Sequence, residues 1–126
     1  MVQTFHTDSA PAAIGPYSQA TRHGDTVYAS GQIPIDPATG EFVAGGVREQ
    51  AQQVLTNAQA VLEAAGTSLA NALQVTVLLA SMDDFAAVNE VYGTFFSEPY
   101  PARMAYAAAG LPRGALVEIA VVAAAG

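Results

Sequence analysis

The chain has 126 residues and a net charge of −7, with 52% hydrophobic and only 12% charged residues. This length predicts a single domain, residues 1–126, that buries a core without disulfides. The acidic balance argues against nucleic acid as a partner, and no apolar run approaches the roughly 20 residues that span a bilayer. Because the N-terminus lacks the basic start and apolar run of a secretory signal, we expect a cytoplasmic protein.

Two absent residue types narrow the chemistry. Without Cys the chain has no thiolate nucleophile and no zinc–thiolate site, and without Lys it cannot form the usual Schiff base with a carbonyl substrate. His6 and His23 are not part of any acidic cluster at metal-ligand spacing. We therefore expect neither a metal nor an organic cofactor.

The first half of the chain predicts a hairpin, a loop and a helix. Residues 17–22 and 26–30 flank the turn at Gly24, and a short extra strand over 2–6 can precede them. Prolines and glycines over 31–40 predict an irregular loop. Apolar residues then recur at helical spacing from Val47 to Ala65, with Gly66 as the residue that ends the helix.

The second half predicts a strand, a helix and two further strands. Alternation over 73–80 indicates a strand, and Ser81 with Asp84 three residues on indicates a helix N-terminus. Pro99 and Pro101 end that helix. Residues 103–107 and 116–124 follow as strands, separated by a turn over 110–114.

The order β-β-α-β-α-β-β predicts an α+β domain with a mixed sheet and both helices on one face. Glu118 falls on the face of the last strand that points away from the helices. If Arg103, Ala105 and Ala107 share that side, a mostly apolar face carries one Arg and one Glu. An uncovered face of this kind predicts a closed homo-oligomer.

Arg103 and Glu118 are the leading candidates for chemistry. The planar fork of Arg103 can hold a carboxylate through two parallel hydrogen bonds, but a structural ion pair with Glu118 explains both residues about equally well. Glu118 on a buried strand needs a partner for its charge or keeps its proton, and either state suits acid/base work.

Four other residues give weaker signals. Tyr17 could point its hydroxyl into a cleft, although an aromatic residue at a strand start is more often packing. Ser30 and Gly31 could bind a polar ligand, but such a pair usually only makes a turn. Asn89 borders the apolar stripe of the second helix, where a structural clamp is the favoured interpretation.

Five segments together resemble the reactive intermediate deaminase family (RidA/YjgF), at the right order and spacing over essentially the whole chain. They are AAIGPYSQA (12–20), SGQIP (30–34), DFAAVN (84–89), PAR (101–103) and VEI (117–119). The resemblance implies a chorismate-mutase-like α+β subunit that forms a homotrimer with a cleft at each subunit boundary.

The resemblance also implies roles for single residues. Arg103 matches the arginine that binds the substrate carboxylate, and Glu118 matches the glutamate that handles the attacking water. Tyr17, Ser30, Gly31 and Asn89 match residues that line the pocket. Ala105 stands where many members have Cys, a position that contributes its backbone carbonyl, so pocket shape and substrate preference are affected more than activity.

The function implied is hydrolytic deamination of small 2-imino acids, such as 2-iminopropanoate and 2-iminobutanoate, to 2-keto acids and ammonia. The alternative is a non-catalytic trimer that binds small 2-keto acids as a sensor through the same Arg103. Ribonuclease or translation-inhibitor activity is a further alternative, which the acidic balance and the lack of Lys disfavour.

Overall fold

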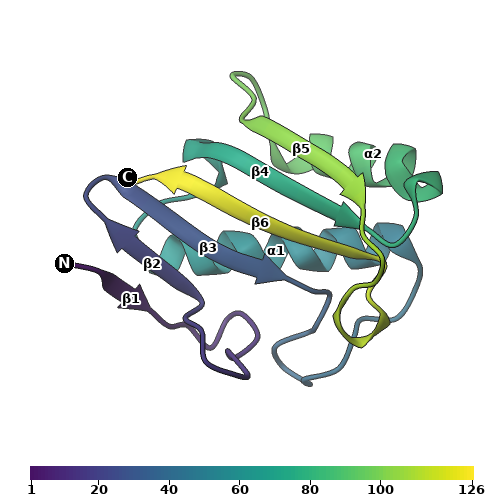
Figure 1. Ribbon diagram of the computed structural model, residues 1–126, viewed down its shortest axis with the longest axis horizontal. Coiled ribbons are helices and arrows are strands. Elements are labelled where there is room, and N and C mark those ends of the chain that lie inside the picture. Colours follow the sequence, from purple (N-terminus) through teal and green to yellow (C-terminus); the bar gives the residue numbers. More distant parts are fainter.

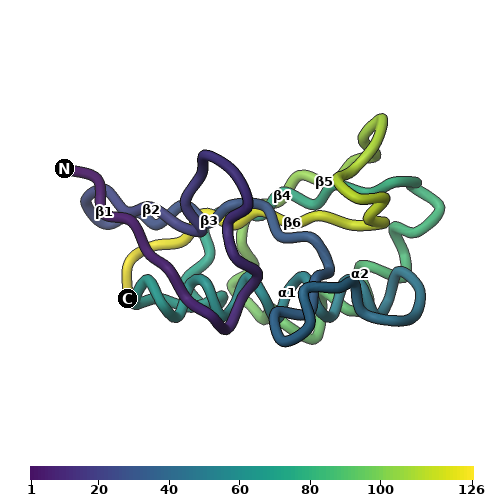
Figure 2. The backbone as a smooth tube through the Cα atoms, turned by 90° about the horizontal axis from the view of Figure 1, so that it is seen from below, coloured from purple at the N-terminus to yellow at the C-terminus, as the bar shows by residue number.

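One six-stranded sheet with two helices on one of its faces makes up the computed structural model, which describes residues 1–126 (Figure 1). Figure 2 shows both helices below the sheet and nothing regular above it. The strands follow the order β1-β2-β3-β6-β4-β5. The predicted α+β class and element order are confirmed, including the extra N-terminal strand.

The elements have the following bounds: β1 Gln3–Phe5, β2 Ala20–His23, β3 Thr26–Gln32, α1 Val47–Ala64, β4 Ala72–Leu79, α2 Phe85–Phe95, β5 Ala102–Ala107 and β6 Val117–Ala124. Short 3-10 helices lie at Leu69–Asn71, Met82–Asp84 and Pro112–Gly114. No helix combines the length and the apolar character needed to cross a membrane.

Strand pairing follows from the connections. β2 and β3 form the predicted hairpin, in which His23 pairs with Thr26 and Gly24 takes a positive φ of 60°. β6 lies antiparallel between β3 and β4. β4 and β5 are parallel because α2 returns the chain across the sheet between them.

The helix α1 ends as its sequence predicts. Gly66 has φ +82°, the N–H of Gly66 donates to Glu63 (3.0 Å), and the N–H of Thr67 donates to Leu62 (3.0 Å). These two bonds form a Schellman motif, which satisfies carbonyls that the helix end leaves free. The second helix starts later than predicted: Ser81 caps the 3-10 turn, with its Oγ accepting from the N–H of Asp83 (3.1 Å), and α2 begins at Phe85.

The core lies between the sheet and the helices. Alternate residues of the central strands are buried, together with the inner stripe of α1: Val75, Val77, Leu79, Val117, Ile119, Val121, Val54, Leu55, Val61 and Leu62. Every second side chain of β6 faces α1, and the side chains of α1 that recur every three or four residues face β6. Each element therefore buries one side. The strand face with the other parity is left uncovered.

The sequence left open which face carries Arg103, and the arrangement with Arg103 and Glu118 on one uncovered face is wrong. In the parallel register Arg103 pairs with Val75 and Ala105 with Val77, both of which face the helices. Glu118 pairs with Leu78, which has the opposite parity. Arg103 and Glu118 therefore lie on opposite sides of the sheet.

The uncovered face is still partly apolar. Three large side chains on this face are about half exposed: Tyr28 at 50%, Met104 at 49% and Tyr106 at 50%. Each of them pairs across the sheet with a residue that also points away from the helices. We call this surface the open sheet face; it also includes Ala120, Val122 and Glu118. Its aromatic and aliphatic side chains fit a subunit interface.

The loop between β3 and α1 is irregular, as predicted, and is tied to the helix by Asn57. This side chain is fully buried, its Nδ2 donates to the carbonyls of Ile35 (2.9 Å) and Ile33 (3.4 Å), and its Oδ1 accepts from Gln53 (2.8 Å). A buried carbonyl without a donor is costly, so this one amide stabilises the loop conformation.

Replacing Asn57 with Leu should lower the free energy of unfolding by about 1–3 kcal/mol, because it removes the donor of two buried carbonyls. Urea unfolding followed by circular dichroism measures the change. Thr56→Ala, an exposed neighbour on the same helix, serves as the control and should change stability by less than about 0.5 kcal/mol. Equal stability of Asn57→Leu and wild type would contradict the assignment.

Candidate functional site

Arg103 is held by groups that leave its charge unpaired. Its Nη1 donates to Oδ1 of Asn89 at 2.6 Å, and its guanidinium carbon lies 4.8 Å from the ring centroid of Tyr92 and 5.5 Å from that of Phe85. No carboxylate lies within ion-pair distance of Arg103, in contrast to Arg48, which pairs with Glu90. A guanidinium has five N–H donors, so donors remain for a ligand.

The helix α2 supplies all three supports because of its spacing. Phe85, Asn89 and Tyr92 are four and three residues apart, which places them on one face of the helix, toward the strand β5. Asn89, which the sequence marked as a structural clamp, forms a hydrogen bond to Arg103. An amide oxygen can accept from a guanidinium without neutralising it, so the charge stays available.

A shallow hollow lies beside this guanidinium. It has a volume of about 370 Å³ and is lined by Asn89, Tyr92, Gly93, Tyr100, Pro101 and Arg103. Ala105, two residues along β5, shares the side of Arg103 and is partly buried against the core. Its methyl group takes no part in lining the hollow.

Glu118 lies in a different cavity, on the other side of the sheet. It is half-buried, no hydrogen bond or ion pair reaches its carboxylate, and burial raises its pKa above the usual range. The ion pair between Arg103 and Glu118, which the sequence left open as an alternative, is absent. A carboxyl group in this environment holds its proton more readily than an exposed one, which suits a group that takes up and releases a proton.

The cavity of Glu118 has a volume of about 550 Å³, and four of the candidate residues line it. They are Tyr17, Ser30, Gly31 and Glu118. A Cβ at position 31 would collide with the carboxylate of Glu118, so close approach of the backbone explains this glycine. The Ser30 hydroxyl donates to the carbonyl of Ser18 (2.6 Å), which fixes the neighbouring loop.

The candidate residues thus form two groups within one chain. Arg103 and Asn89 border the hollow beside α2, whereas Tyr17, Ser30, Gly31 and Glu118 line the cavity on the open sheet face. Neither of these two cavities contains members of both groups. We call these the arginine half-site and the glutamate half-site.

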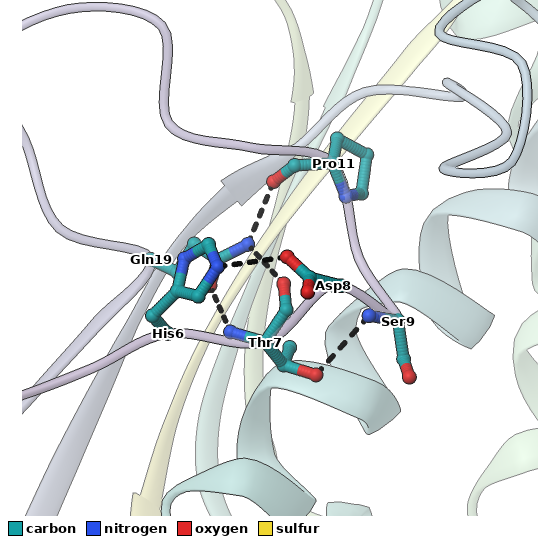
Figure 3. Close-up of polar contacts among 6 residues, drawn as sticks. All are labelled: His6, Thr7, Asp8, Ser9, Pro11 and Gln19. Carbon is teal, nitrogen blue, oxygen red and sulfur yellow. Dashed lines mark hydrogen bonds and ion pairs between the residues drawn. The ribbon is translucent and has the colours of Figure 1, made fainter.

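Gln19, whose hydrogen bonds are drawn in Figure 3, lines the cavity of the glutamate half-site and was not singled out in the sequence. It is 3% exposed, its Oε1 accepts from the N–H of Thr7 (2.7 Å), and its Nε2 donates to the carbonyls of Thr7 (3.0 Å) and Pro11 (2.8 Å). These bonds close the segment that carries Ala12, Ile14 and Tyr17 over the cavity. In contrast, His6 and Asp8 form an exposed pair beside it (2.9 Å).

Arg113 also lines the cavity of Glu118 and was not singled out in the sequence. It has a left-handed φ of 55°, lies 3.8 Å from the carboxylate of Glu41, and its guanidinium lies 5.1 Å from the ring centroid of Phe42. Arg113 thus has an acidic partner in Glu41 and an aromatic ring against its guanidinium, whereas Arg103 has no acidic partner. Gly114, the next residue, also has positive φ. The glycine marks a turn in the sequence, but nothing in the sequence marks the positive φ of Arg113.

Comparison with known proteins gives consistent matches. The family model described as endoribonuclease L-PSP matches residues 7–125. The chain is 52% identical to the 2-iminobutanoate/2-iminopropanoate deaminase of Mus musculus, over 96% of this chain and 90% of that protein. Among solved structures it is similar to RidA from a Psychrobacter species (TM-score 0.93, 49% identity, 97% and 98% coverage). It is also similar to Escherichia coli TdcF with bound serine (TM-score 0.92, 41% identity, 98% and 99% coverage).

Replacing Glu118 with Gln should raise the free energy of unfolding at neutral pH. The folded chain raises the pKa of Glu118, so the native state binds the proton more tightly than the unfolded state does. In wild type, this group therefore contributes fully to the free energy of unfolding below its unfolded pKa of about 4.3. The contribution is lost as pH rises through the higher folded pKa.

The difference between Glu118→Gln and wild type should accordingly grow from pH 4 to neutral pH, as measured by denaturant unfolding at several pH values. Glu98→Gln, at an exposed glutamate, provides the matched control. A difference that stays constant with pH, or that favours wild type at pH 7, would show that the folded chain does not disfavour the Glu118 carboxylate.

Proposed function

This chain belongs to the endoribonuclease L-PSP family, which includes the RidA and YjgF proteins, and we propose that it hydrolyses 2-iminobutanoate and 2-iminopropanoate to 2-keto acids and ammonia. The observation that carries this proposal is the state of Arg103. Its guanidinium is oriented by an amide oxygen and two rings and has no carboxylate of the chain bound to it. It is thus prepared for the carboxylate of a small acid.

The two half-sites support a catalytic cleft built between copies of the chain. Arg103 and Glu118 lie on opposite sides of the sheet, so one copy alone cannot present both to the same small substrate. A homotrimer, as the family resemblance implies, would join the arginine half-site of one copy to the glutamate half-site of the next. The partly apolar open sheet face would be buried in that assembly.

The reaction follows from these positions. The substrate carboxylate binds Arg103, and a water bonds through oxygen to the C=N carbon while Glu118 takes its proton and passes it to the nitrogen. In the resulting carbinolamine Glu118 takes the hydroxyl proton and transfers it to the amine. The C–N bond then breaks, a C=O bond forms, and ammonia leaves, so that one water is consumed for each imine.

Neighbouring groups would keep this geometry in place. Gly31 leaves the space that the Glu118 carboxylate occupies, and Tyr17 and Ser30 line the same cavity. The carbonyl of Ala105 belongs to the strand that presents Arg103. The chemistry uses carboxylate, guanidinium and water alone, and we assign the protein to the cytoplasm, where amino-acid breakdown produces such imines.

Two other functions make different predictions. A sensor of 2-keto acids would bind its ligand through Arg103 without accelerating imine hydrolysis. An endoribonuclease, the activity named in the family model, would need cations along an RNA-binding surface, whereas this chain has four cations, eleven acids and a net charge of −7. The bound serine of TdcF favours a small amino-acid-like ligand at this fold.

Replacing Arg103 with Ala should lower kcat/KM for 2-iminobutanoate by about 100-fold or more, because it removes a bidentate carboxylate contact worth about 3 kcal/mol. Threonine dehydratase generates the imine, and release of the keto acid is followed. Arg103→Lys keeps the charge but loses the planar fork, and should fall between Ala and wild type.

Wild type that fails to accelerate keto-acid release, yet binds 2-oxobutanoate, would favour the sensor. RNA cleavage that persists in Arg103→Ala would favour the nuclease. Arg22→Ala is the matched control for loss of a cation, since the Nε of Arg22 only donates to the carbonyl of its own hairpin turn.

Mixing two inactive variants tests the shared cleft. Copies with Arg103→Ala and copies with Glu118→Gln, unfolded and refolded together, should recover about a quarter of wild-type activity, since one boundary in four joins an intact Arg103 to an intact Glu118. Each variant refolded alone is the control. Recovery no greater than the average of the two separate variants would show that Arg103 and Glu118 do not act across a boundary.

A further inference from the structure

We propose that Tyr92 is a positioning residue for the reaction: its ring face holds the guanidinium of Arg103 in the plane in which it receives the substrate carboxylate. This inference rests on the proposed function, because it takes Arg103 as the carboxylate-binding group. Tyr92 reaches Arg103 from the helix α2, and its place in the sequence marks it only as one member of the apolar stripe.

The Tyr92 ring is a fixed surface. The residue is 7% exposed, and its ring stacks on Phe96 with centroids 4.3 Å apart and planes inclined by 25°. The guanidinium carbon of Arg103 lies 4.8 Å from the same centroid, nearer than the 5.5 Å to Phe85. A cation at this distance from an aromatic ring is attracted to its negative face.

Two different contacts together define the orientation of the guanidinium. The Oδ1 of Asn89 accepts from Nη1 at 2.6 Å and fixes one edge, while the Tyr92 ring lies against the group. Neither contact neutralises the charge. A long side chain that is already ordered before binding loses less freedom when a ligand arrives, so affinity is gained through preorganisation.

The ring, and not the hydroxyl, carries this role. The Tyr92 Oη is buried and has no hydrogen-bond partner, so it makes no polar contact with Arg103 or with Asn89. A buried hydroxyl without a partner stabilises nothing. Phe at this position would therefore keep the relevant contact, whereas an aliphatic residue of similar size would lose it.

Two aliphatic variants test the proposal, so that poor folding of one does not decide the result. Tyr92→Leu and Tyr92→Met should each raise KM for 2-iminobutanoate about two- to tenfold, the cost of ordering one long side chain on binding. Because the carboxylate is held both in the ground state and in the transition state, kcat should change much less than KM. Tyr92→Phe should return KM to within about twofold of wild type.

Phe96→Leu is the matched control, because Phe96 is about as buried as Tyr92, at 6%, and stacks on its ring, whereas only the rings of Phe85 and Tyr92 lie against the Arg103 guanidinium. It should leave KM near the wild-type value even where it lowers thermal stability. An unchanged KM in both aliphatic variants, an equal rise in Phe96→Leu, or a Tyr92→Phe variant that behaves like Tyr92→Leu would each overturn the proposal. If Arg103→Ala itself leaves kcat/KM unchanged, the proposed function fails instead.

Discussion

The site depends on a cation that is held without being neutralised. Arg103 has an amide oxygen and two aromatic rings around it, and these groups orient a guanidinium while leaving its charge intact. A carboxylate in the same place would have satisfied the group and closed it to a ligand. The unpaired charge costs the single chain little folding free energy, because Arg103 is exposed to solvent.

The regular elements could be predicted because their apolar spacing is unambiguous. Residues 47–65 repeat at helical spacing, Gly66 ends the helix, and the last strand alternates cleanly through Val117, Ile119 and Val121. The face that carries Arg103 could not be predicted. Small or apolar residues occupy both sides of β5, so only the parallel pairing with β4 determines the direction of each side chain.

The two half-sites show a second limit of reading a sequence. The family resemblance groups Tyr17, Ser30, Gly31, Asn89, Arg103 and Glu118 as one pocket, whereas in a single chain they line two separate cavities. Gln19 was missed for a related reason: its three bonds reach backbone 8 and 12 residues away, and local spacing carries no trace of them. Both the separation of the two cavities and the role of Gln19 depend on contacts between residues far apart in the sequence.

The close packing of Gly31 against Glu118 constrains how such a chain can change over evolutionary time. A mutation that adds a methyl group at position 31 would push directly on the acid, and shortening the acid to Asp would relieve the collision but withdraw the carboxylate by about one methylene. Either change would move the carboxylate from its present position in the cavity. The two positions, 87 residues apart in the sequence, are coupled through this one contact, in which the size of residue 31 limits where the acid can lie.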